Sequence, residues 1–157
     1  MRAPANVRLE RLETLLNQLL YESEKGKPII VEGTKDRDAL RTIGIAGRID
    51  SLQNSRLNPI GFVEKLGDIR QAVVLTDFDN QGVSLANRLT RILISHGTSV
   101  NTAIWHSLRE LTRSDLRSIE ELPRYRERLR LETENPKHAT FTRKHSRCDT
   151  HTRKIRP

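Results

Sequence analysis

The 157-residue chain has little of several residue types, and each shortage excludes a class of protein. Its one cysteine, Cys148, excludes an internal disulfide framework. Hydrophobic residues make up 35% of the chain and aromatic residues only 4%, so we expect part of it to lie outside a packed core. No apolar stretch is long enough to cross a membrane, and residues 1–6 lack the apolar segment of a signal peptide. These features predict a soluble, cytoplasmic protein without a membrane partner.

Positive charge is concentrated near the C-terminus. From residue 123 onward eleven Lys or Arg residues stand against four acids, which accounts for most of the net charge of +8. Residues from 132 on are poor in apolar side chains, so we expect a disordered tail. Such a tail can bind a polyanion by releasing counterions; the alternative is a solvated terminus without a partner. We therefore expect an amphipathic helix within 1–24 packed on the core, a domain over 25–122, and a basic helix and tail over 123–157.

The tail also contains four residues that can ligate zinc. They are His138, His145, Cys148 and His151. The spacing of the last three could meet one ion, but zinc motifs usually come as cysteine pairs on an ordered turn. Zinc binding and chance spacing in a solvated tail both remain open.

Two short apolar segments each end in acid. Residues 28–31 lead into Glu32, and residues 72–76 lead into Asp77, with Asp79 two positions later. Such segments are typical of buried parallel strands, whose carboxyl ends carry the chemistry of open α/β sheets. In extended backbone Asp77 and Asp79 point the same way, while Phe78 turns aside into packing. If the two strands are neighbours, Glu32 joins them, and the mutual repulsion of three carboxylates favours a protonated member or a bound magnesium ion.

Helical and extended patterns alternate along the chain. Helices are expected over residues 6–24, 35–43 and 83–93, strands over 45–49 and 100–105, a helical turn over 62–66, and a helix over 115–130 that bends or restarts at Pro123. This order predicts an α/β fold of Rossmann-like architecture, with a parallel sheet of about four strands flanked by helices.

The two acidic strand ends resemble those of the Toprim family, the catalytic domain of topoisomerases, bacterial primases and several small nucleases. The family pattern is a strand-end Glu-Gly followed by Asp-x-Asp-x-x-Gly at a later strand, matched here by Glu32-Gly33 and by Asp77-Phe78-Asp79 with Gly82. The likeness covers about residues 25–122. It is similar in detail to small stand-alone archaeal Toprim proteins, which share a downstream Ile-Glu-Glu-Leu like that at residues 119–122.

The resemblance implies roles for the acids. Glu32 would be the general acid or base, or a ligand of a first magnesium ion; Asp77 would be shared by two metal positions and Asp79 would hold the second. The expected cofactor is Mg²⁺ as two ions, with Mn²⁺ as a substitute. Asp36 is either an outer partner that orients metal-bound water or an acid in the first turn of a helix capped by Thr34.

One departure from the family concerns phosphate binding. Topoisomerase members usually carry basic residues just after the second Asp, where this chain has Asn80 and Gln81. A phosphate clamp must then come from elsewhere, and the candidates are Lys35, Arg37 and Arg41.

Missing parts narrow the function. The chain has no room for the tyrosine-bearing domain of a topoisomerase, and no four-cysteine module of a recombination mediator. What remains resembles small Toprim nucleases, including the enzyme that trims a ribosomal RNA precursor. We therefore expect a magnesium-dependent phosphoryl-transfer enzyme, a nuclease on structured RNA with DNA second. The alternative is a non-catalytic nucleic-acid or ribosome-binding module that uses bound metal and a basic tail.

Overall fold

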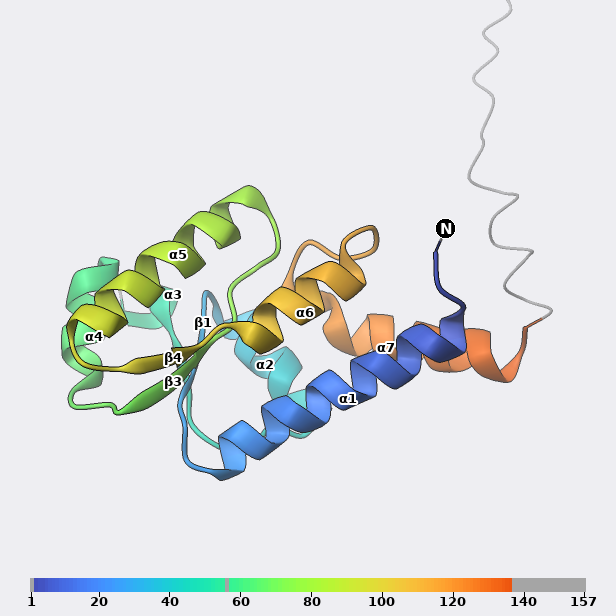
Figure 1. The fold of residues 1–157 in the computed structure, drawn as a ribbon, viewed down its shortest axis with the longest axis horizontal. Coiled ribbons are helices and arrows are strands. Elements are labelled where there is room, and N and C mark those ends of the chain that lie inside the picture. Colours follow the sequence, from blue (N-terminus) through green and yellow to red (C-terminus); the bar gives the residue numbers. More distant parts are fainter. Residues whose placement is uncertain (1, 56, 137–157) are drawn as a thin grey trace, which may run out of the picture.

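The structure is a computed structural model that describes residues 2–55 and 57–136 (Figure 1). Four strands form one parallel sheet in the order β2-β1-β3-β4, where β1 is Ile29–Val31, β2 Ile49–Ser51, β3 Gln71–Val74 and β4 Ser99–Asn101. The helices are α1 (Ala5–Glu24), α2 (Thr34–Ile43), α3 (Leu52–Ser55), α4 (Pro59–Leu66), α5 (Asn80–Ser95), α6 (Ala103–Thr112), the 3₁₀ helix η1 (Ile119–Glu121) and α7 (Leu122–Glu134). The expected Rossmann-like α/β fold is confirmed.

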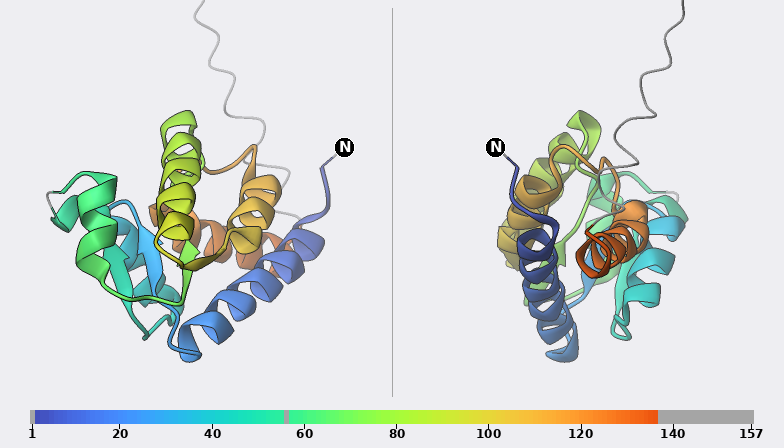
Figure 2. Two further views of the ribbon diagram at one scale, coloured as in Figure 1. Left: turned by 60° about the vertical axis from the view of Figure 1, so that its left-hand side comes forward. Right: turned by 90° about the vertical axis from the view of Figure 1, so that its right-hand side faces the viewer.

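Strands β1 and β3 form the centre of the sheet. Ile29 lies opposite Val73 and Ile30 opposite Val74. Apart from the exposed Gln71, the residues of both strands are buried, as helices on each side of the sheet require (Figure 2). The chain turns from β1 to β2 on one side and returns to β3 on the other. The carboxyl ends of β1 and β3 therefore form the topological switch point, where open α/β sheets bind ligands.

The strand expected over 45–49 is displaced. Residue Ile45 is buried but belongs to a loop, because Gly44 adopts a left-handed conformation (φ 111°) that ends α2. The Arg41 guanidinium then donates to the carbonyls of Ile45 and Gly47 at 2.8 and 2.7 Å, which keeps both from the sheet. Pairing with β1 begins only at Ile49.

The strand expected over 100–105 ends early. Strand β4 stops at Asn101, whose Oδ1 accepts the N–H of Ala103 at 3.0 Å and starts α6. Trp105 therefore lies on a helix, where it is 2% exposed and donates its indole N–H to the Thr76 carbonyl at 2.8 Å. This tryptophan therefore belongs to the core.

A buried arginine joins α1 to the C-terminal half. Arg8 is 7% exposed, and its guanidinium contacts Asp115 at 3.1 Å, the Tyr125 hydroxyl at 3.3 Å and Glu132 at 3.3 Å. These partners lie in the loop after α6 and on α7. Helix α1 also buries Leu12, Leu16 and Leu19, so it packs on the core as expected.

No helix within residues 2–55 and 57–136 is both long and apolar enough to cross a membrane. His138, His145, Cys148, His151 and most of the basic tail lie outside the described residues. Zinc binding and the role of the tail stay predictions.

Candidate functional site

The acidic strand ends meet, as the sequence predicts. Leu75 donates its backbone N–H to the Ile30 carbonyl at 2.8 Å, which extends the β1–β3 pairing to the edge of the sheet. Glu32 directly follows β1 and Asp77 lies three residues after the end of β3, and the Asp77 N–H donates to Glu32 Oε1 at 3.1 Å. Glu32 is thus fastened to the backbone of the Asp77 loop.

Asp77 lies at the centre of the acid cluster. Its Oδ1 accepts the backbone N–H of Ile119 at 2.9 Å, so η1 holds the side chain of Asp77 while Glu32 holds its backbone N–H. Burial raises the pKa of Asp77 to about 7; the Ile119 hydrogen bond opposes this rise, and the charges of Asp36, Glu32 and Asp79 add to it. The structure therefore brings these four acids within electrostatic range of one another.

Glu32 and Asp36 share this environment. Burial raises the pKa of Glu32, with a hydrogen bond from Asp77 acting against the rise and the charges of Asp79 and Asp36 acting with it. Burial also raises the pKa of Asp36, which is 5% exposed and accepts the Gly33 N–H at 3.0 Å. Gly33, not Thr34, is the N-cap of α2, because the helix already begins at Thr34. Asp36 thus supports the first turn of α2 and also faces the cluster.

Asp79 is exposed and caps α5. Its Oδ1 accepts the Gly82 N–H at 2.7 Å, and the second carboxylate oxygen has no hydrogen-bond partner among the described residues. Phe78 is buried near Trp105, with ring centroids 6.5 Å apart, so it turns into packing as expected. The backbone doubles back here: a Cβ on Gly82 would lie 2.0 Å from the Asp77 carbonyl oxygen.

The carboxylates of the acid cluster are residue types that fit magnesium. Because the described residues contain no three-residue metal group, magnesium binding stays a prediction. Glu32, Asp77 and Asp79 supply carboxylate oxygens, which Mg²⁺ prefers, and no basic side chain is among the causes that shift the pKa of Glu32 or Asp77. Within the part of the chain that the structure describes, no three His, Cys, Asp or Glu side chains are arranged to hold an ion. Mg²⁺ commonly binds through one or two carboxylates, waters and substrate phosphate, which these acids can provide.

The three phosphate-binding candidates differ in position. Lys35 is exposed in the first turn of α2, and Arg37 there pairs with Asp38 at 3.5 Å. Arg41 lies in the last turn of α2, where it donates to two carbonyls, and a phosphate contact by it stays a prediction.

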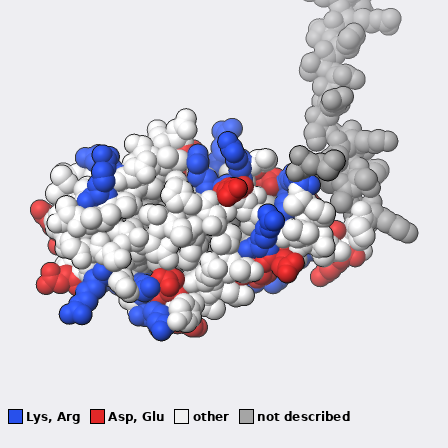
Figure 3. Space-filling view, in the orientation of Figure 1, with Lys and Arg blue, Asp and Glu red and all other residues white. Residues whose placement is uncertain are grey.

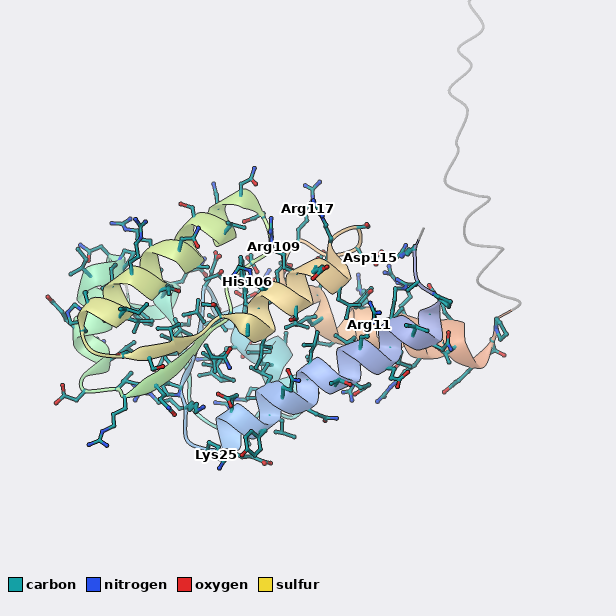
Figure 4. All side chains as sticks on the ribbon, in the orientation of Figure 1. Arg11, Lys25, His106, Arg109, Asp115 and Arg117 are labelled. Atoms are coloured by element: carbon teal, nitrogen blue, oxygen red, sulfur yellow. The ribbon has the colours of Figure 1, made fainter. Side chains whose placement is uncertain are left out.

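Two other arginines contact the Asp77–Asp79 segment. Arg109 donates its Nε–H to the Phe78 carbonyl at 3.4 Å, and the Arg117 carbonyl accepts the Phe78 N–H at 2.8 Å (Figure 4). Sequence reasoning missed both because they lie far downstream of the acidic motif. The one available signal was the Ile-Glu-Glu-Leu segment, whose Ile119 holds Asp77 two residues after Arg117.

We predict a pH dependence centred on Asp77. Above its ordinary pKa of 3.8 the unfolded chain loses this proton, whereas the folded chain keeps it until about pH 7. Stability should therefore fall as pH rises through this window, lowering the melting temperature in EDTA by roughly 5–10 °C between pH 4 and pH 8. Asp77→Asn retains an acceptor for the Ile119 N–H and removes the charge. At pH 8 this variant should be more stable than wild type. Its stability should also fall less steeply with pH, because only the raised pKa values of Glu32 and Asp36 still contribute.

Melting curves of wild type, Asp77→Asn and the control Asp68→Asn, a change at an exposed loop residue, measure this effect. Equal pH slopes in wild type and Asp77→Asn would contradict the burial of an uncompensated acid at this position.

Fold and site together define an α/β protein with an acid cluster at the switch point of a parallel sheet. No family model matches the chain. It is 35% identical to a UPF0292 protein of Methanosarcina barkeri over 127 residues, 80% of this chain and 87% of the relative. It is 33% identical to a UPF0292 protein of Methanocaldococcus jannaschii over 116 residues, 74% of this chain and 90% of the relative. The chain belongs to the UPF0292 family.

A solved structure of a protein from Aquifex aeolicus is similar in fold. The TM-score is 0.57 at 24% identity, over 69% of this chain and 95% of that protein. At this identity the likeness shows the fold alone.

Proposed function

We propose that this protein is a magnesium-dependent phosphoryl-transfer enzyme of the Toprim type, a nuclease that acts on structured RNA first and DNA second. The observation that carries the proposal is the meeting of Glu32 with Asp77 and Asp79 at the carboxyl edge of the central strands. Burial, and then the charges of the neighbouring acids, raise the pKa of Glu32 and of Asp77, and no basic side chain is among the causes.

Each acid has a part in this proposal. Glu32 has a raised pKa and one oxygen fixed on the Asp77 N–H, which leaves its second oxygen to accept or return a proton at the scissile phosphate. Asp77 and Asp79 would hold magnesium together with Glu32, while Asp36 keeps the first turn of α2 in place beside them. Bound magnesium supplies positive charge to the phosphate oxygens during an in-line displacement.

A second candidate has its own supporting observation. Within residues 2–55 and 57–136, no group of three acids is arranged to hold an ion. A non-catalytic nucleic-acid or ribosome-binding module would need less than a complete two-metal centre, and the basic tail would add affinity for it.

The deciding experiment uses the full chain with end-labelled hairpin RNA and the matching DNA, in Mg²⁺, Mn²⁺ or EDTA. We expect cleavage of the RNA with either metal and none in EDTA, together with a rise in melting temperature on adding Mg²⁺. Asp77→Asn should lose both effects. Binding without cleavage under any metal would favour the binding module, and neither binding nor cleavage of RNA or DNA would contradict both functions.

A further inference from the structure

Two arginines, Arg109 and Arg117, contact the loop that carries Asp77 and Asp79. Arg109 extends from α6 to the Phe78 carbonyl, which lies between Asp77 and Asp79 in the chain, and its guanidinium lies 5.8 Å from the centroid of the Trp105 ring. Trp105 itself is hydrogen-bonded to Thr76. The arginine head is therefore held against the same loop that carries two of the acids.

Arg117 approaches this loop from the segment after α6. Its carbonyl accepts the Phe78 N–H at 2.8 Å and its own N–H donates to Glu121 at 3.0 Å, so its backbone is fixed. Its exposed side chain has no hydrogen bond, ion pair or ring contact with any residue that the structure describes. Arg117 is thus an exposed cation on a segment that contacts the Asp77–Asp79 loop, and its side-chain donors are unused within the described residues.

Arg109 and Arg117 combine two properties: both lie on segments that contact the Asp77–Asp79 loop, and neither has an acid partner among the described residues. Acid partners lie within 4 Å of several others, namely Arg2, Arg8, Arg37, Arg48, Arg126, Arg128 and Arg130. No carboxylate of the described residues pairs in this way with Arg109 or Arg117. Figure 4 shows both projecting on the same side of the molecule beside the segment from β3 to α5, where Figure 3 shows exposed basic side chains.

We propose that Arg109 and Arg117 bind the phosphate backbone of a nucleic acid, so that the chain of phosphates lies across the loop between β3 and α5, on its α6 side. This inference rests on the proposed function for its partner. The guanidinium group can form two parallel hydrogen bonds to phosphate oxygens. An exposed arginine without an acid partner has no ion pair to break when phosphate replaces its water. On the α2 side Arg37 has Asp38 as a partner and Arg41 donates to carbonyls at the far end of the helix. This leaves exposed Lys35 there, a cation without the guanidinium fork.

The test compares two double variants of the full chain. R109A/R117A removes the proposed clamp, whereas R70A/R91A removes two exposed arginines elsewhere. Arg70 precedes β3 at the opposite edge of the sheet, and Arg91 lies on α5 with its Nε–H on the Asn87 carbonyl at 3.4 Å, as Arg109 has on Phe78. Affinity for labelled hairpin RNA is measured in EDTA as a function of salt, which separates binding from cleavage.

We expect R109A/R117A to weaken RNA binding about tenfold or more at roughly 50 mM salt and to lower the slope of log affinity against log salt by about 1.4–1.8. R70A/R91A should stay within about twofold with a smaller change of slope. R117A alone, which removes no described side-chain contact, should show a part of the loss without a change in melting temperature. R109K/R117K should restore the salt slope more than the affinity, since lysine keeps the charge and loses the fork.

Equal losses in the two double variants would overturn the clamp and indicate general attraction of charge. Unchanged affinity in R109A/R117A, with cleavage by wild type intact, would overturn the clamp and leave the proposed function standing. Loss of affinity in R109A/R117A with a wild type that never cleaves would support the clamp and contradict the nuclease. A wild type that binds neither RNA nor DNA overturns both.

Discussion

Replacing Glu32 by Gln should slow cleavage of labelled RNA by about a hundredfold or more, while RNA affinity stays within a few fold of wild type. The side-chain oxygen of Gln can still accept the Asp77 N–H, so the loop keeps its position. What is lost is the charge and the ability to take up a proton. Single-turnover cleavage and filter binding of the same RNA measure the two effects separately.

Two further variants sharpen this result. Glu64→Gln changes an exposed acid on α4 and should cleave as wild type does. Asp79→Asn keeps an oxygen for the Gly82 N–H and should recover part of its activity at high metal concentration, because its proposed part is to hold an ion. If Glu32→Gln cleaves at the wild-type rate in a preparation free of contaminating nuclease, the site is not catalytic.

Gly82→Ala should destabilise the protein by about 3 kcal/mol or more. The added Cβ would lie 2.0 Å from the Asp77 carbonyl oxygen and 2.9 Å from its Cα, and backbone atoms cannot move aside as a flexible side chain can. Either α5 or Asp77 must shift, and the Thr76 hydroxyl would lose its contact with the Gly82 carbonyl. Urea unfolding curves measure the loss.

Gly61→Ala is the matched control, since it lies in a helix and its Cβ would meet nothing nearer than 3.4 Å. Ala is the better helix former by up to about 1 kcal/mol, so this variant should be as stable as wild type or more stable. A Gly82→Ala protein with wild-type stability would mean that the turn after Asp79 is looser than described.

The central strands were predictable because their residue types fit only one structural position. Ile29, Ile30, Val73 and Val74 are β-branched and bounded by turns, and only the middle of a parallel sheet buries such a segment on both faces. The acids that follow could then be placed at one edge. The outer elements were less predictable, because Ile45 is buried without belonging to a strand, and apolar character alone does not separate packing from pairing.

The arginines next to the acid site, Arg109 and Arg117, could not be predicted from the sequence, for a different reason. The candidates Lys35, Arg37 and Arg41 follow Glu32 closely in the chain. Arg109 and Arg117 reach the Asp77 loop through α6 and the segment after it, so their position depends on how α6 packs near the sheet. Local spacing carries no information on that packing.

The central strand pair joins segments that are far apart in the chain, with Ile29 opposite Val73 and four other elements between them. Contacts of this kind are slow to form, because a long loop must close before they repay the lost chain entropy. Glu32 and Asp77 come from the two sides of that closure. In a refolding experiment the acid cluster would therefore assemble only once this pairing has formed, and compact intermediates that contain helices alone would lack it.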